Sequence, residues 1–163
     1  MRAAEAQSLA GPQPEPLIVF RCDASQTMGS GHVMRCRNLG RALKGRNAQS
    51  VFICRQQTGD LIALLRQEFQ VLVLPEPPPV LECAGDEPSQ PEERVFYSRW
   101  LPCSEEHDAR ASVRALTDAQ LPLPHWIVLD HYSLGARWQQ QMLNELRQPN
   151  GTAPSLLVVD DLA

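Results

Sequence analysis

Five short apolar runs, separated by segments with helical periodicity, constrain the fold of this chain more than any other feature. The runs are Leu17–Cys22, Ser50–Cys54, Gln70–Leu74, His125–Asp130 and Ser155–Val159. Runs of this length are typical of strands that are buried on both faces. Their alternation with helices predicts an α/β fold, a Rossmann-like parallel sheet with helices on both faces.

Four helices are expected between these strands. In the first, apolar residues recur at helical spacing, and Gly45 ends it. In the third, Ser104 fits an N-cap that is followed by acidic residues, which favour the positive end of the helix dipole. The predicted helices are His32–Lys44, Asp60–Gln67, Ser104 to about Ala119, and Ala136–Arg147.

Two segments fall outside this pattern. Residues 1–16 are rich in Ala, Gln and Pro without the apolar stretch of a secretory signal, so we expect a disordered leader. Residues from about 75 to 102 are rich in Pro, Glu and Ser, which predicts a long surface loop within a domain that spans 17–163. The last run, Ser155–Val159, is apolar enough that we expect a central strand. We therefore expect a second domain that this chain lacks.

Charge and cysteine usage narrow the function classes. The net charge of −4 and the pI of about 5.5 argue against a basic nucleic-acid surface. No apolar run approaches the roughly 20 residues that cross a membrane. The five cysteines are odd in number and lack Cys-x-x-Cys spacing, which argues against a disulfide framework or zinc site. We expect a cytoplasmic protein in which Cys22 and Cys54 are small buried side chains.

A glycine-containing loop between the first strand and the first helix is the strongest candidate for chemistry. Gly29 and Gly31 allow a tight turn and close approach of a ligand to the backbone, and the helix N–H groups then face that ligand. His32 begins the helix, where a neutral ring is favoured and can accept a proton as a general base. The alternative is a histidine that only packs or caps locally.

Further candidates lie at the carboxyl ends of strands, where open parallel sheets bind ligands. Asp23 could orient His32, bind a substrate hydroxyl or stabilise its own turn. Arg35 could reach a phosphate or carboxylate, or lie on the surface. Asp130 could cap its loop, and Tyr132 could cover the edge of the core. The residues expected to contact substrate are Asp23, Gly29, Gly31, Arg35, Asp130, His131 and Tyr132.

Two remaining choices concern metal binding and the identity of the base. Asp160 and Asp161 have no third ligand at a recognisable spacing, so turn capping is preferred and no metal site is expected. His131 competes with His32 for the role of base, because it also follows the end of a strand.

Several segments together resemble one enzyme family. They are Arg21–Ser25, Gly29–Cys36, Phe52–Arg55, Trp100–Leu101, Asp130–Tyr132 and Val159–Ala163. In order and separation they resemble the N-terminal half of the UDP-sugar hydrolases of pseudaminic acid biosynthesis. These enzymes cleave UDP-2,4-diacetamido-2,4,6-trideoxy-β-L-altropyranose. The resemblance implies a GT-B-type enzyme of two Rossmann-like domains, with the active site in the cleft between them.

The resemblance also implies a mechanism. Water replaces UDP at the anomeric carbon with inversion, and neither a metal nor a cofactor takes part. His32 matches the motif histidine that activates the water, and Tyr132 matches a position that faces the sugar. The nucleotide-binding C-terminal domain is absent from this chain, so we expect the chain alone to be inactive or weakly active. The alternative is a non-catalytic Rossmann-like module that binds a ligand or partner.

Overall fold

The computed structural model of the protein describes residues 15–77, 97 and 100–159. The expected leader at 1–16 and the proline-rich loop at about 75–102 lie largely outside the described residues, as do Asp160 and Asp161. The strands are β1 (Leu17–Cys22), β2 (Gln49–Arg55), β3 (Gln70–Leu74), β4 (Trp126–Asp130) and β5 (Ser155–Val158). The helices are α1 (Gly31–Lys44), α2 (Ile62–Leu65), α4 (Glu105–Asp118) and α5 (Ala136–Glu145).

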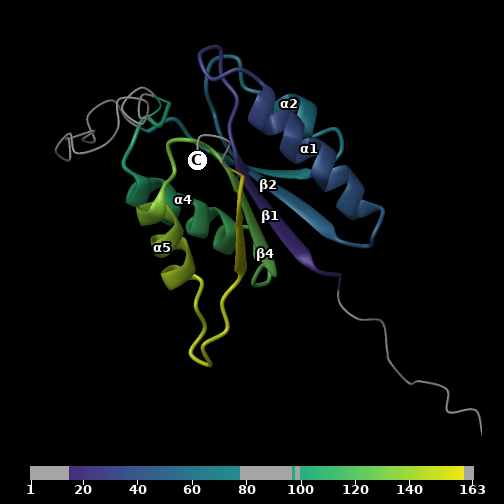
Figure 1. The fold of residues 1–163 in the computed structure, drawn as a ribbon, viewed down its shortest axis with the longest axis vertical. Coiled ribbons are helices and arrows are strands. Elements are labelled where there is room, and N and C mark those ends of the chain that lie inside the picture. The colour runs from purple at the N-terminus through teal and green to yellow at the C-terminus, as the bar shows by residue number, and fades with distance from the viewer. Residues whose placement is uncertain (1–14, 78–96, 98–99, 160–163) are drawn as a thin grey trace, which may run out of the picture.

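The strands form one parallel sheet in the order β3-β2-β1-β4-β5. Figure 1 shows α1 and α2 on one side of this sheet and α4 and α5 on the other. The prediction of a Rossmann-like α/β sheet covered on both faces is therefore confirmed. The central strand, β1, is buried along its whole length, which explains its continuous apolar run.

Successive side chains of a strand point to opposite faces of the sheet. Alternate residues of the strands therefore pack into two separate cores. On the α1 face, Phe20 and Phe52 stack with ring centroids 4.7 Å apart. On the other face, Val19 packs in one cluster with Leu116 of α4. Trp138 of α5 is completely buried against β4. Each such large apolar side chain contributes about 1.5–3 kcal/mol through burial.

The helix ends follow the local signals in the sequence. The Ser104 side chain accepts a hydrogen bond of 3.2 Å from the backbone N–H of His107, so the predicted N-cap of α4 is confirmed. Gly45 follows the last residue of α1, also as predicted. The short helix α2 covers only four residues of the predicted 60–67. None of the helices in the described parts of the chain is long and apolar enough to cross a bilayer.

The position of β5 corrects one expectation. This strand lies at the edge of the sheet formed by the described residues, not at its centre. Leu156 packs against the α5 core, whereas Leu157 and Val158 are 43% and 40% exposed. An apolar run therefore does not by itself fix the place of a strand in the strand order.

Candidate active site

The site lies at the carboxyl ends of β1 and β4, where the strand order changes direction. The chain passes from β1 to the neighbouring β2 on one side, and β4 pairs with β1 on the other. Cys22 at the end of β1 is in register with Asp130 at the end of β4. In open parallel sheets such a switch point at the carboxyl ends is the usual place for a ligand. The register also brings Asp23, the next residue of the chain, close to the end of β4.

The loop after β1 delivers the N-terminus of α1 to this edge. The backbone N–H of Gly29 donates to the Ser25 carbonyl at 2.8 Å, and the Ser25 hydroxyl accepts from Met28 N–H at 3.1 Å. Gly29 has φ of 79°, a conformation that side chains rarely adopt. A Cβ at Gly29 or Gly31 would meet nothing within 4 Å, so space is open beside both glycines. Ser30 precedes the helix without a side-chain cap.

His32 and Asp130 form a buried hydrogen-bonded pair. The Nδ1 atom of His32 lies 2.7 Å from Asp130 Oδ1, and His32 is only 5% exposed. Because the ionised carboxylate can only accept, Nδ1 carries the proton in the neutral ring, and Nε2 is then the nitrogen with the lone pair. Nε2 makes no hydrogen bond with any of the described residues. The arrangement can therefore accept a proton at Nε2, while Asp130 fixes the ring.

Arg35 and Cys36 complete the surroundings of Asp130. Arg35 donates through Nε to Oδ2 at 2.8 Å and through Nη2 to Oδ1 at 2.7 Å. The Cys36 thiol lies 3.6 Å from Oδ2. Burial alone would raise the pKa of Asp130, but the hydrogen bonds from Arg35 and His32 bring that pKa below its usual value. Asp130 is thus ionised at neutral pH, and Arg35 stays 41% exposed at the rim.

Asp23 has a different role from those expected for it. It is completely buried, and its carboxylate receives both Nη groups of Arg21 at 2.6 and 2.9 Å. The backbone N–H of Arg55 donates to Asp23 Oδ1 at 2.7 Å. The orientation of His32 by Asp23 is therefore wrong, because Asp130 occupies that place. In this arrangement Asp23 joins β1 to β2 and is enclosed too deeply to meet a substrate hydroxyl.

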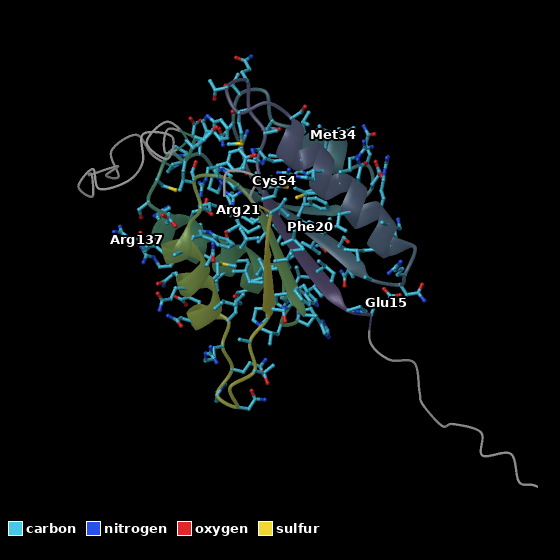
Figure 2. The ribbon with its side chains drawn as sticks, in the orientation of Figure 1. Glu15, Phe20, Arg21, Met34, Cys54 and Arg137 are labelled. Carbon is cyan, nitrogen blue, oxygen red and sulfur yellow. The ribbon has the colours of Figure 1, made fainter. Side chains whose placement is uncertain are left out.

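Below this edge lies a cluster of buried charges that the sequence analysis missed. Asp108 of α4 accepts from Arg21 Nε at 2.9 Å and from Arg55 Nη2 at 2.7 Å, and Trp138 Nε1 donates to it at 3.0 Å. Figure 2 shows Arg21 inside the molecule. Burial alone would raise the pKa of Asp108, but Arg21 and Arg55 lower it to about 2. Arginines within buried strands were the available signal, since such charges need a carboxylate partner.

His131 turns both of its ring nitrogens toward the protein. Nδ1 accepts from the backbone N–H of Ser133 at 3.1 Å, so in the neutral ring the proton lies on Nε2. Nε2 is 3.3 Å from Asp23 Oδ2, although the direction does not meet the geometry of a hydrogen bond. The contact is therefore electrostatic. Both nitrogens face protein groups, so His131 is not placed to accept a proton from water.

A cluster of three aromatic side chains packs next to the buried ring of His32. The Tyr132 ring meets the His32 ring edge-on with centroids 4.6 Å apart, and the Trp100 centroid lies 6.0 Å from it. Tyr97 contacts both Trp100 and Tyr132, at 4.6 and 5.0 Å. All three are partly buried. Of these, Tyr132 was predicted from the sequence, and Trp100 was noticed only within the motifs of the family resemblance.

The cysteines behave as expected at the positions that the structure describes. Cys22, Cys36 and Cys54 are free and buried, and Cys103 is buried as well. Hydrogen bonding to Cys36 and Cys54, together with burial, raises the pKa of the Cys22 thiol well above its usual value. The Cys22 thiol therefore stays protonated at neutral pH. Within the described residues, no group of His, Cys, Asp or Glu has the arrangement of a metal site.

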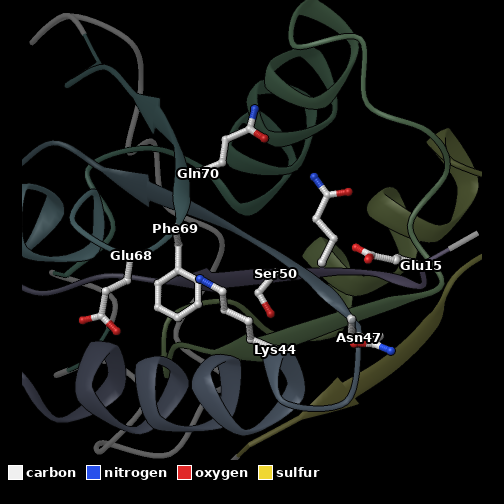
Figure 3. A pocket seen from close by; sticks show the side chains of 9 residues that line it. Glu15, Lys44, Asn47, Ser50, Glu68, Phe69 and Gln70 are labelled. Atoms are coloured by element: carbon white, nitrogen blue, oxygen red, sulfur yellow. The ribbon is translucent and has the colours of Figure 1, made fainter.

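One hollow in the surface lies away from these residues. It measures about 400 Å³, and Lys44, Ser50, Glu68 and Gln70 are among its lining residues. Figure 3 shows it beside the amino-terminal ends of the strands. A second hollow of about 710 Å³ lies between β3 and α4. Neither hollow is lined by His32 or Asp130.

Comparison of the chain with models of known protein families gives no match, and comparison with curated proteins gives none either.

Proposed function

We propose that this chain carries the catalytic base of a UDP-sugar hydrolase. The single observation that supports it best is the 2.7 Å contact between His32 Nδ1 and Asp130 at the switch point, with Nε2 unpartnered among the described residues. The resemblance stated above supplies the substrate, UDP-2,4-diacetamido-2,4,6-trideoxy-β-L-altropyranose. The products are the free sugar and UDP. The free buried thiols of Cys22, Cys36 and Cys54 fit the cytoplasm, where thiols stay reduced.

In the proposed reaction, His32 Nε2 removes a proton from water as the water oxygen bonds to the anomeric carbon. The bond from that carbon to the UDP oxygen breaks, and its electron pair leaves with UDP. Asp130 holds the Nδ1 proton and stabilises the imidazolium that forms. The N–H groups that begin α1 and the guanidinium of Arg35 are suited to face the leaving diphosphate.

The nucleotide itself needs further contacts. By the resemblance, a second domain supplies most of the contacts to UDP, so we expect the isolated chain to bind UDP weakly or not at all. Calorimetric titration of the chain with UDP tests this expectation. A micromolar affinity would contradict the assignment of the nucleotide site to another domain.

The test of the function is UDP release from the altropyranose substrate. We would assay the chain alone and mixed with the C-terminal half of a hydrolase from the family that it resembles, with that half alone as a blank. His32→Gln should abolish most of the release, whereas His107→Ala, on the remote helix α4, should not change it. No release above the blank in the mixture would contradict the proposal.

A second function is favoured by one contact. Arg35 neutralises much of the Asp130 charge, which leaves less of it to stabilise an imidazolium. In a module that binds a ligand without catalysis, His32 and Asp130 would only shape the loop. That alternative predicts that the chain binds a ligand without releasing UDP. It also predicts that His32→Gln binds the ligand as tightly as the unmodified chain does.

A further inference from the structure

The strand β3 lies at one end of the strand order and has a free edge. On its inner side, the carbonyl of Leu74 accepts a hydrogen bond of 2.9 Å from the N–H of Gln56, which follows β2. Backbone groups alternate in direction along a strand, so those of Val71 and Val73 point away from β2. None of the described residues supplies a backbone partner on that outer side. The edge can therefore pair with a further strand.

The hollow of about 710 Å³ lies beside this edge, between β3 and α4. The residues of α4 that line it recur every three or four positions, which places them on one face of the helix. The apolar part of the lining includes Leu72 and Val73 from β3 and the small side chains of Ala111 and Ala115 from α4. Small side chains on the helix leave room for an extended chain next to the strand.

The α4 side of the hollow is mainly cationic. It carries His107, Arg110 and Arg114, and Asp118 is the single acidic residue among the described lining residues. Arg110 is exposed and forms no ion pair within the part of the chain that the structure describes. Arg114 is 83% exposed, and its contact with Asp118 at 3.6 Å lies in solvent. A ligand that complements this lining has apolar groups together with negative charge.

We propose that the hollow beside β3 is a docking site for an acidic peptide segment of another protein, which binds in extended conformation as an added strand of the sheet. The peptide backbone bonds to the outer N–H and C=O groups of Val71 and Val73, and these bonds supply affinity. Carboxylates of the peptide lie next to Arg110 and Arg114 and supply specificity. The proposal does not depend on the hydrolysis proposed above, because the hollow is not lined by His32 or Asp130.

Titration of the full chain with fluorescently labelled peptides tests the proposal. The peptides have about seven residues, enough to span the five residues of β3. One peptide alternates valine with glutamate, and its control alternates valine with lysine. We expect the glutamate peptide to bind, and the lysine peptide to bind at least roughly tenfold more weakly. Added salt should weaken the binding of the glutamate peptide, because the arginines are exposed.

Two kinds of variant separate the charges from the strand edge. Arg110→Glu combined with Arg114→Glu should weaken binding of the glutamate peptide roughly tenfold. Arg66→Glu is the matched control, because Arg66 is an exposed arginine that follows α2 on the other side of the sheet. Val73→Pro removes an N–H that points away from β2, a place where an edge strand tolerates proline, and it should also weaken binding.

Amide hydrogen exchange measured by NMR reports the added strand directly. Bound peptide should slow exchange at Val71 and Val73, because their N–H groups become hydrogen-bonded. Binding without this slowing would overturn the proposal, since no strand would have been added. No binding of the glutamate peptide, or equal effects of the Arg110–Arg114 double change and Arg66→Glu, would overturn it as well.

A further variant tests whether the chain fills the hollow itself. The segment 80–94 contains five acidic residues, Glu82, Asp86, Glu87, Glu92 and Glu93. We would change all five to the corresponding amides and repeat the titration. We expect the affinity for the glutamate peptide to stay the same. Binding that appears only in this variant would show that the occupant is the chain's own segment, and the proposal of a separate partner would be wrong.

Discussion

Two Asp–His pairs lie side by side at the carboxyl edge of the sheet and have opposite environments. Asp23 follows β1 and faces His131 from the loop after β4. Asp130 ends β4 and binds His32 from the loop after β1. Each carboxylate also receives an arginine fork. Asp23 is enclosed by Arg21 and the backbone of Arg55, whereas the arginine of Asp130 lies at the rim.

The difference shows that the number of protein partners separates a structural pair from one available for chemistry. Both nitrogens of His131 face protein groups, so this ring holds a loop in place. Among the residues that the structure describes, His32 is bound through Nδ1 alone, so Nε2 can accept a proton from a ligand or water. The same two residue types thus hold the loop after β4 in place in one pair. In the other pair they leave a ring nitrogen available to a ligand.

The largest expected effect comes from the charges beneath the Asp23 pair. Asp108→Ala leaves Arg21 and Arg55 without the carboxylate that both share, so we expect a loss of about 3–5 kcal/mol of unfolding free energy. Urea unfolding followed by tryptophan fluorescence measures it. Asp118→Ala is the control, since its pair with Arg114 is exposed and should contribute about 0–1 kcal/mol. Equal effects of the two changes would show that the cluster is not a stabilising element.

The two histidines provide the direct test of the comparison. In the mixture that releases UDP, His32→Ala should lower kcat by roughly a hundred- to ten-thousandfold with little change in KM. His131→Ala should have a smaller effect on kcat and should lower the unfolding free energy instead. Steady-state kinetics and urea unfolding of both variants decide the matter. Normal turnover in the His32 variant, with loss in the His131 variant, would move the base to His131.

Substitution of the two carboxylates, Asp130 and Asp23, should separate activity from stability as substitution of the two histidines does. Asp130→Asn removes the charge that stabilises an imidazolium at His32, and we expect kcat to fall roughly ten- to a hundredfold. The effect is smaller than loss of the base, because Arg35 already offsets part of that charge. Asp23→Asn should reduce stability more than kcat. If Asp23→Asn instead impairs kcat more than Asp130→Asn, the two pairs have exchanged roles.

Much of this arrangement follows from local patterns in the sequence, and the rest does not. Apolar runs and helix signals place the strands and helices, and the rule for strand ends places Asp130 and His32 at one edge. The partner of His32 could not be assigned, because Asp23 and Asp130 have the same chemistry and are close in space. Asp108 lies many residues from Arg21, and only the packing of α4 on the sheet brings them together.

Acid should weaken the buried cluster around Asp108. The pKa of Asp108 is about 2 in the folded protein against a usual 3.8, because Arg21 and Arg55 outweigh the effect of burial. A lowered pKa stabilises the fold above the usual value, and this contribution is lost as the pH falls from about 4 toward 2. The difference corresponds to roughly 2 kcal/mol. Urea unfolding at about pH 5 and about pH 3 should show the loss, and Asp108→Asn should reduce it.

The smallest expected effect concerns the turn that presents His32. An added Cβ meets nothing within 4 Å at Gly29 or Gly31, so the two positions differ chiefly in backbone conformation. Gly29 has φ of 79°, and Gly31 begins a helix. Gly29→Ala should therefore cost about 1 kcal/mol of unfolding free energy, whereas Gly31→Ala should be neutral or slightly stabilising. Urea unfolding of the two variants measures this difference. The turn belongs to the His32 side alone, so Gly29→Ala should lower kcat while the acid sensitivity of the Asp108 cluster stays the same. A change in that acid sensitivity would show that the two pairs are coupled and cannot be treated as separate devices.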